Sequence, residues 1–157
     1  MALTPLELAL RLLAARSRTE EELLRALLRR GVSEANAKAA VARLRELRYM
    51  DDREVASARA KSLVERGDAP RRVVQRLLRQ GVSEADAKGA ADEARDGQGD
   101  DELAARALMR RLRGKEPADE REKRRLFRML VAKGHKPGAA ARAVGIEWNG
   151  EDDAYEA

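Results

Sequence analysis

The sequence predicts an all-α protein of three tandem three-helix repeats, each about 50 residues long, that together form an elongated rod, straight or curved. Ala, Leu, Arg and Glu dominate the composition, and all four are good helix formers. Residues 25–41, RALLRRGVSEANAKAAV, return as residues 75–91, QRLLRQGVSEADAKGAA, with 11 of the 17 aligned positions identical. A diverged third copy, RMLVAKG, occupies residues 128–134.

The first repeat, residues 1–48, should hold three short helices. Thr4 followed by Pro5 and Glu7 is a typical helix start, and Thr19 with Glu22 forms a second capping pattern. Gly31 fits a left-handed helix end, and Ser33 caps the third helix. The apolar residues that we expect to face inward are Leu6, Ala9, Leu10, Leu13, Leu24, Leu27, Leu28, Ala37, Ala40, Val41, Leu44 and Leu47.

The second repeat, residues 49–97, restarts the pattern. Asp51 caps a helix that runs to about residue 66, a second helix runs from Pro70 to Gly81, and a third begins at Ser83 and ends near residue 95. A Gly- and Asp-rich break follows at residues 96–100. The residues of the middle helix expected to face inward are Val73, Val74, Leu77 and Leu78.

The third repeat, residues 98–146, is the most diverged. We expect its helices near residues 101–113, 119–133 and 137–145, with the middle one ending at Gly134. A single unit of this size is close to the lower limit for independent stability, so neighbouring repeats should support one another. Residues 147–157 form an acidic and flexible C-terminal tail in this prediction. We expect Trp148 and Tyr155 to belong to a frayed terminus, the alternative being that they dock the tail or a partner.

The composition excludes much catalytic chemistry. The chain has no cysteine and a single histidine, His135, in a turn-like GHKPG segment. Thiol nucleophiles, disulfides and Cys/His zinc sites are therefore excluded, and no Gly-rich phosphate-binding loop is present. We expect no catalytic residue, no metal ligand and no cofactor, and hence no enzyme.

The charge distribution points to an anionic partner. The whole chain carries +5, while residues 1–146 hold 33 bases against 23 acids, a formal charge of +10, and 26 of the bases are arginine. Such a basic body suits nucleic acid or an acidic protein surface. The other interpretation is a solvated surface in an arginine-rich composition. The N-terminus does not read as a signal peptide and no apolar run could span a membrane, so we expect a soluble, cytoplasmic protein.

One difference between the repeats is informative. Residues 20–22 are Glu-Glu-Glu, as a helix start favours, whereas the matching residues 70–72 are Pro-Arg-Arg. Local helix stability does not account for these arginines. Arg72, Arg76 and Arg79 share one helix face, which makes this stripe the best candidate for a functional surface, with an ordinary solvated face as the alternative.

The junction of the first two repeats carries a family resemblance. The segment LRELRYMDD at residues 44–52, Arg66-Gly67 and RVVQRLLRQGVS at residues 72–83 are similar to the RecX family, bacterial regulators of the RecA recombinase. Residues 123–134 resemble the family's closing repeat, and the likeness covers roughly residues 6–146. This chain departs from the family pattern at Arg48, Val55 and Leu63, where glycine, an aromatic and a base are usual.

The resemblance implies a negative regulator that lies along the groove of the RecA–single-stranded-DNA filament. Such a protein inhibits ATP hydrolysis, strand exchange and filament growth in recombination and SOS repair. The implied partners are the RecA filament and the single-stranded DNA within it, with free DNA a weak partner at most, and the protein is expected to be a monomer in the bacterial cytoplasm. Our candidate contact residues are Arg71, Arg72, Arg76, Arg79, Arg66, Arg29 and Arg30. The structural signature comprises Tyr49, Asp51, Asp52, Gly31, Gly81 and Gly134, with Asp51 as a helix cap and Tyr49 as a half-buried wedge between repeats.

Two other functions stay open at this point. Short helices joined through Gly-Val-Ser turns are also typical of helix-turn-helix proteins that bind DNA directly. A helical-repeat adaptor for an acidic protein would show the same charge pattern. The helices after the turns are Ala-rich and of mixed charge, which does not favour base reading in the major groove.

Overall fold

The computed structural model describes residues 1–150, which form nine α-helices and no strand within that range. The helices are α1 (Pro5–Ala15), α2 (Glu20–Leu28), α3 (Glu34–Glu46), α4 (Asp52–Glu65), α5 (Pro70–Arg79), α6 (Glu84–Arg95), α7 (Asp100–Leu112), α8 (Glu120–Ala132) and α9 (Pro137–Val144). Every predicted helix is present, and the helices of the second and third repeats begin and end within two residues of their expected bounds.

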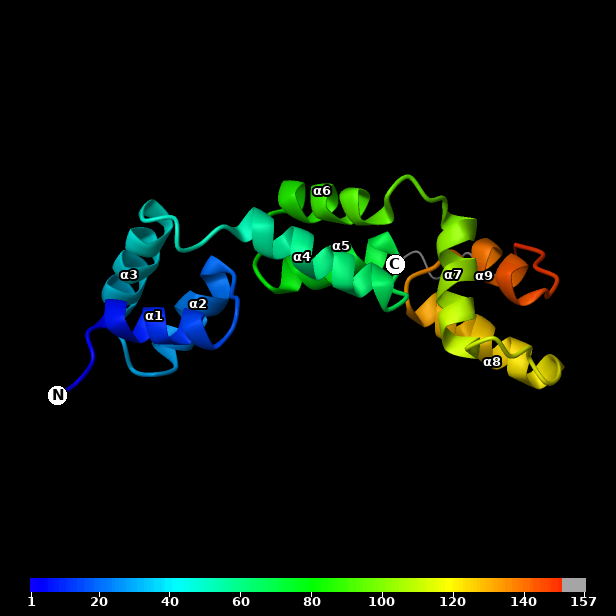
Figure 1. The fold of residues 1–157 in the computed structure, drawn as a ribbon, viewed down its shortest axis with the longest axis horizontal. Helices are drawn as coiled ribbons and strands as arrows, with labels where there is room; N and C mark the ends of the chain where they lie inside the picture. The colour runs from blue at the N-terminus through cyan, green and yellow to red at the C-terminus, as the bar shows by residue number, and fades with distance from the viewer. Residues whose placement is uncertain (151–157) are drawn as a thin grey trace.

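The helices form three consecutive bundles in an elongated arrangement, with the N-terminal bundle at one end (Figure 1). In each bundle the first two helices pack on the third: α1 and α2 on α3, α4 and α5 on α6, α7 and α8 on α9. Three separate hydrophobic cores result, built mainly from Ala and Leu. Leu103 of α7 belongs to the second core, so the exact division at residues 97 and 98 stays our proposal.

The helix ends follow the predicted chemistry. Thr4 and Thr19 form complete capping boxes, and the hydroxyl groups of Ser33 and Ser83 accept from backbone amides three residues on. The three signature glycines adopt the left-handed conformation, with φ of +83° at Gly31, +88° at Gly81 and +91° at Gly134. Because side chains other than glycine are strained there, these turns depend on glycine.

Four predicted core residues were assigned wrongly. Side chains expected inward are partly exposed instead: Leu10 at 37%, Leu28 at 40%, Leu47 at 44% and Leu78 at 43%. Each lies at the border of its apolar stripe. Because many side chains in the three helices of a bundle are small, the neighbouring helices cover only part of each helix surface. The fully buried positions include Leu23 and Leu27, which lie on the central line of α2.

The first junction joins repeats 1 and 2 through polar side chains. Arg59 Nη1 and Nη2 each donate to the Glu22 carboxylate at 2.9 Å, and Nη2 also donates to the Ser17 carbonyl oxygen at 3.0 Å. The Thr19 hydroxyl donates to the carbonyl oxygen of Gln80 at 2.5 Å. Burial opposes ionisation of Glu22, but hydrogen bonds from Arg59 and Thr19 outweigh it, so the pKa of Glu22 lies below its ordinary value.

The second junction joins repeats 2 and 3 mainly through the backbone. The Ala69 amide donates to the carbonyl oxygen of Lys133 at 2.9 Å, and the Lys133 ammonium donates to the carbonyl oxygen of Arg66 at 3.0 Å. His135 is buried, and its Nε2 donates to the carbonyl oxygen of Gly67 at 2.8 Å. The only histidine therefore has a structural contact, and its burial lowers its pKa.

Both junctions place the end of one middle helix on the start of another. The C-terminal turn of α5 meets the start of α2, where a Cβ added at Gly81 would collide with Glu21. The C-terminal turn of α8 meets the start of α5, where a Cβ at Gly134 would lie 2.8 Å from the Arg72 Cβ. The middle helices α8, α5 and α2 thus follow one another head to tail along the rod, so that the partial charges at their facing ends attract (Figure 1).

Candidate functional site

The predicted stripe on α5 is organised around a buried acid. Asp68 precedes α5 and is only 5% exposed, with Arg76 Nε 3.2 Å and Arg72 Nε 3.7 Å from its carboxylate oxygens. Lys133 Nζ lies 3.9 Å from the same carboxylate. A buried carboxylate is costly without cations beside it. Our expectation that local stability does not explain the arginines at 71 and 72 was therefore wrong for Arg72, which neutralises Asp68 together with Arg76.

The arginines of this stripe remain accessible. The side chains of Arg72 and Arg76 are 39% and 40% exposed, and Arg71 and Arg79 are exposed. Arg66 is exposed as well, next to the Lys133 contact. The structure thus brings five of the seven candidate residues together, four along α5 and one shortly before it.

Arg29 and Arg30 lie apart from this group. Both are exposed at the C-terminal turn of α2, in the first repeat. The acidic first turn of α2, Glu20 to Glu22, separates them from Arg79 at the end of α5. They therefore do not extend the α5 stripe directly.

A second arginine stripe, which our sequence reasoning missed, lies on α8. Its members are exposed and recur at spacings of three and four residues, which places them on one helix face: Arg121, Arg124, Arg125 and Arg128. Arg125 lies 3.4 Å from Glu122, while the other three have no acidic partner within 4 Å among the described residues. The same spacing that revealed the α5 stripe could have revealed this one.

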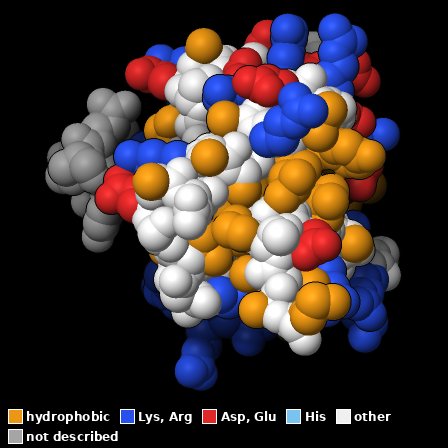
Figure 2. Space-filling view, turned by 90° about the vertical axis from the view of Figure 1, so that its left-hand side faces the viewer, with side chains coloured by type: hydrophobic (Ala, Val, Ile, Leu, Met, Phe, Trp, Pro, Cys, Tyr) orange, Lys and Arg blue, Asp and Glu red, His pale blue; other side chains and the backbone are white. Residues whose placement is uncertain are grey.

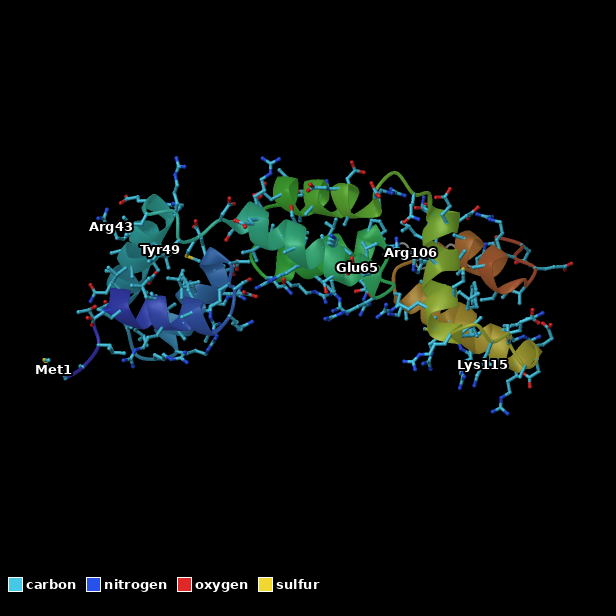
Figure 3. All side chains as sticks on the ribbon, viewed as in Figure 1. Met1, Arg43, Tyr49, Glu65, Arg106 and Lys115 are labelled. Atoms are coloured by element: carbon cyan, nitrogen blue, oxygen red, sulfur yellow. The ribbon has the colours of Figure 1, made fainter. Side chains whose placement is uncertain are left out.

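The two stripes meet at the second junction. Ala132, the last residue of α8, is exposed, and its carbonyl oxygen accepts a 2.6 Å hydrogen bond from Arg72 Nη1. Nitrogen-tipped side chains project below both helices along the lower edge of the rod (Figure 3). We call the combined surface the arginine row; it comprises Arg121, Arg124, Arg125, Arg128, Arg72, Arg76 and Arg79. At 1.5 Å per helical residue, the two helices span roughly 35 Å.

An open groove of about 780 Å³ lies beside the arginine row, between α5 and α9. Its cations are largely compensated: Lys136 pairs with Asp100 at 3.0 Å and Arg142 with Asp101 at 2.8 Å. The hydrogen bond from Lys136 lowers the pKa of Asp100, which keeps this acid charged. Arg71 also lines the groove, without an acidic partner among the described residues.

Trp148 lines the same groove and packs against Phe127 with the ring centroids 5.5 Å apart. Our prediction that Trp148 belongs to a frayed terminus was therefore wrong, because α8 offers an aromatic surface. Tyr155 and most of the acidic tail lie outside the described residues.

The signature residues have structural roles. Asp51 caps α4, as predicted, by accepting from the amides of Arg53 and Glu54. Asp52 accepts a 2.9 Å hydrogen bond from the amide of Glu20, across the first junction, and burial raises its pKa. Tyr49 is 65% exposed, so the predicted wedge between repeats is wrong; the interface is occupied by Arg59 and its partners instead.

No metal-binding cluster and no membrane-spanning helix stand out within residues 1–150. The His, Asp and Glu side chains there do not gather in groups of three that could hold an ion. None of the helices combines the length and the apolar character needed to cross a bilayer.

Comparison with known proteins shows which family shares this sequence and architecture. The family model described as "RecX, first three-helix domain" matches residues 6–44. The regulatory protein RecX of Stenotrophomonas maltophilia strain K279a is 33% identical over 142 residues, which cover 90% of this chain and 85% of that protein. The chain belongs to the RecX family.

Further RecX proteins agree with this assignment. The RecX of S. maltophilia strain R551-3 is 32% identical over the same share of both chains. The crystal structure of RecX from Lactobacillus salivarius superposes with a TM-score of 0.63 at 16% identity, covering 90% of this chain and 92% of that one. A second crystal structure, of a regulatory protein RecX, gives a TM-score of 0.65 at 22% identity and covers 90% and 70% of the two chains. The predicted family and the predicted all-α repeat fold are thus both confirmed.

Proposed function

We propose that this RecX-family protein is a negative regulator of RecA that lies along the RecA–single-stranded-DNA filament. The arginine row carries the proposal, since it is an exposed, extended and only partly compensated cationic surface on a rod. An extended groove bordered by acidic protein and phosphate is the kind of partner that such a surface fits. The groove beside the row, with Arg71 and Trp148, adds to the same contact area.

Inhibition requires no catalytic group in the regulator. A rod that contacts several filament subunits at once stabilises one arrangement of them and opposes the rearrangements that ATP hydrolysis and strand exchange require. Filament growth would slow for the same reason. The proposed mechanism is therefore binding alone, through the arginine row.

The decisive experiment is a titration of RecA ATPase activity on single-stranded DNA with this protein. We expect inhibition at low salt that weakens as salt rises, because arginine–phosphate contacts release counterions. The variant Arg124→Glu with Arg128→Glu should raise the half-inhibitory concentration by about tenfold or more, since each reversal turns an attraction into a repulsion. These residues are preferable to Arg72 and Arg76, whose reversal would set new carboxylates beside buried Asp68.

The matched control is Arg106→Glu with Arg110→Glu, which makes the same charge change on α7. We expect it to shift inhibition much less than the α8 variant. Equal shifts for the two variants would show that only net charge matters and would contradict the arginine row. Absence of inhibition by the parent protein, together with tight binding to free duplex DNA, would favour the direct DNA-binding alternative.

A further inference from the structure

The rod makes a similar end-to-start contact between middle helices twice, and it leaves one half of such a contact unused at each end. Within the chain, the C-terminal turn of α5 docks on the start of α2, and that of α8 docks on the start of α5. Among residues 1–150, the C-terminal turn of α2 and the start of α8 have no such partner: a Cβ built on Gly31 would meet nothing within 4 Å, and Asp119 is exposed. The array is therefore open at both ends.

The free turn of α2 reproduces the docked turn of α5. Residues 27–33 read LLRRGVS and residues 77–83 read LLRQGVS, so only Arg30 and Gln80 differ. Their glycines have nearly the same backbone conformation, with φ of +83° at Gly31 and +88° at Gly81. A surface that fits the turn of α5 thus also fits the turn of α2.

The free start of α8 reproduces the docked start of α2. In α2, Thr19 accepts from the amide of Glu22, whose carboxylate returns to the Thr19 amide. In α8, Asp119 accepts from the amide of Glu122, whose carboxylate returns to the Ala118 amide. Both starts are acidic and capped in nearly the same way.

The free pair differs from the docked pair in how its halves attract. In the docked pair the Thr19 hydroxyl donates to the backbone carbonyl oxygen of Gln80. The Asp119 carboxylate cannot donate to the matching carbonyl oxygen of Arg30, so this hydrogen bond is lost in the free pair. Its attraction is instead one of charge, between the exposed Arg29 and Arg30 at the turn of α2 and the acidic start of α8.

We propose that copies of this protein associate end to end, with the C-terminal turn of α2 in one copy docked on the start of α8 in the next. The contact is heterologous, so it propagates along a line rather than closing a dimer. The end of the rod formed by repeat 1 gathers apolar side chains in the middle of its face, with charged residues toward the rim (Figure 2). Six of the eight exposed large apolar residues of the described chain fall within residues 1–49: Met1, Leu3, Leu10, Leu28, Leu47 and Tyr49.

The association is tested first without any partner, by sedimentation of the purified protein over rising concentration at low salt. We expect the weight-average mass to rise with concentration. Either Arg29→Glu with Arg30→Glu, or Glu120→Arg, should weaken the association constant by about tenfold or more, because like charges then face each other. An equimolar mixture of the two variants should restore it, since each reversed end finds a reversed partner.

The control variant Arg11→Glu with Arg16→Glu makes the same charge change as the α2 variant, on exposed residues in and directly after α1 of the same repeat, and should associate like the parent protein. A parent protein that stays monomeric up to about 1 mM, the limit of a very weak contact, would overturn the proposal. So would a mixture that associates no better than its separate variants.

The consequence for regulation rests on the proposed function: copies lying along a RecA filament would contact one another and bind cooperatively. The parent protein should give a binding curve to RecA filaments with a Hill slope above one, and Glu120→Arg should lower that slope toward one while binding persists. Failure to bind the filament at all would contradict the proposed function, whereas the sedimentation result would still decide the end-to-end contact.

Discussion

The geometry of the rod depends on the first junction, and Glu22→Gln tests it with the smallest change of shape. The Glu22 and Arg59 side chains are only 17% and 20% exposed, and they share two hydrogen bonds of 2.9 Å. The substitution removes the negative charge and leaves Arg59 half-buried. Arg59 keeps its contacts with the Ser17 carbonyl oxygen and the Gln80 side chain.

The expected cost follows from the degree of burial. Removing one partner of a fully buried ion pair costs about 3–5 kcal/mol, whereas an exposed pair contributes about 0–1 kcal/mol. Arg59 retains part of its exposure and its hydrogen bonds to Ser17 and Gln80, and the amide oxygen of the new side chain can still accept one more. We therefore expect Glu22→Gln to lower the free energy of unfolding by about 2 kcal/mol. Combined with Arg59→Met, the double variant should cost about 1–2 kcal/mol less than the sum of the single variants.

Urea unfolding at neutral pH, followed by circular dichroism, measures these differences. The matched control is Glu34→Gln, which breaks the exposed Glu34–Lys38 pair on α3 and should lower the free energy of unfolding much less than Glu22→Gln does. Equal costs for the two glutamines, or strict additivity of Glu22→Gln and Arg59→Met, would refute the view that this pair holds the repeats together.

Two further predictions concern the glycine turns and the buried histidine. Gly134→Ala should destabilise the protein by about 1 kcal/mol more than Gly31→Ala in thermal unfolding. Both positions have positive φ, but only the Cβ at residue 134 would crowd the Cβ of Arg72, at 2.8 Å. Equal losses of stability would mean that the second junction accommodates the added methyl group without cost. The lowered pKa of His135 means that the unfolded chain binds this proton more readily, so its contribution to stability is intact above the ordinary pKa of 6.5 and is lost as pH falls below it. The thermal midpoint of the parent should fall more between pH 8 and about 5.5 than that of His135→Asn, which has no proton to gain there; identical pH profiles would contradict this.

Local signals in the sequence were sufficient for the helices and their ends. Caps such as Thr19 and Asp51 and stops such as Gly81 act within a few residues, so pattern and structure agree there. The repeated segment further indicated the number of bundles and their order. The head-to-tail contact of α5 with α2 could not be predicted, because it joins Thr19 to Gln80 across 61 positions of sequence.

The candidate site was predicted only in part for the same reason. The spacing of Arg72, Arg76 and Arg79 located one stripe, but Asp68 gave no sign in the sequence that it would be buried beneath two of them. Burial of a charge depends on what packs over it, here Lys133 from the next repeat. The opposite error was made for Tyr49. We expected this aromatic side chain at the junction to be half-buried, and it is exposed.

The two halves of the arginine row should contribute differently to binding. On α5, Arg72 is held by its hydrogen bond to the Ala132 carbonyl oxygen and Arg76 by its contact with Asp68, so little conformational entropy is lost when they contact an anion, but part of their charge is already compensated. On α8, Arg121, Arg124 and Arg128 have no acidic partner in the described structure, so they offer more attraction at a greater cost of ordering. The α5 arginines would therefore fix the position of an anionic partner, and the α8 arginines would supply most of the salt-dependent affinity. Charge reversal on α8 should for this reason weaken binding without disturbing the junction between repeats 2 and 3.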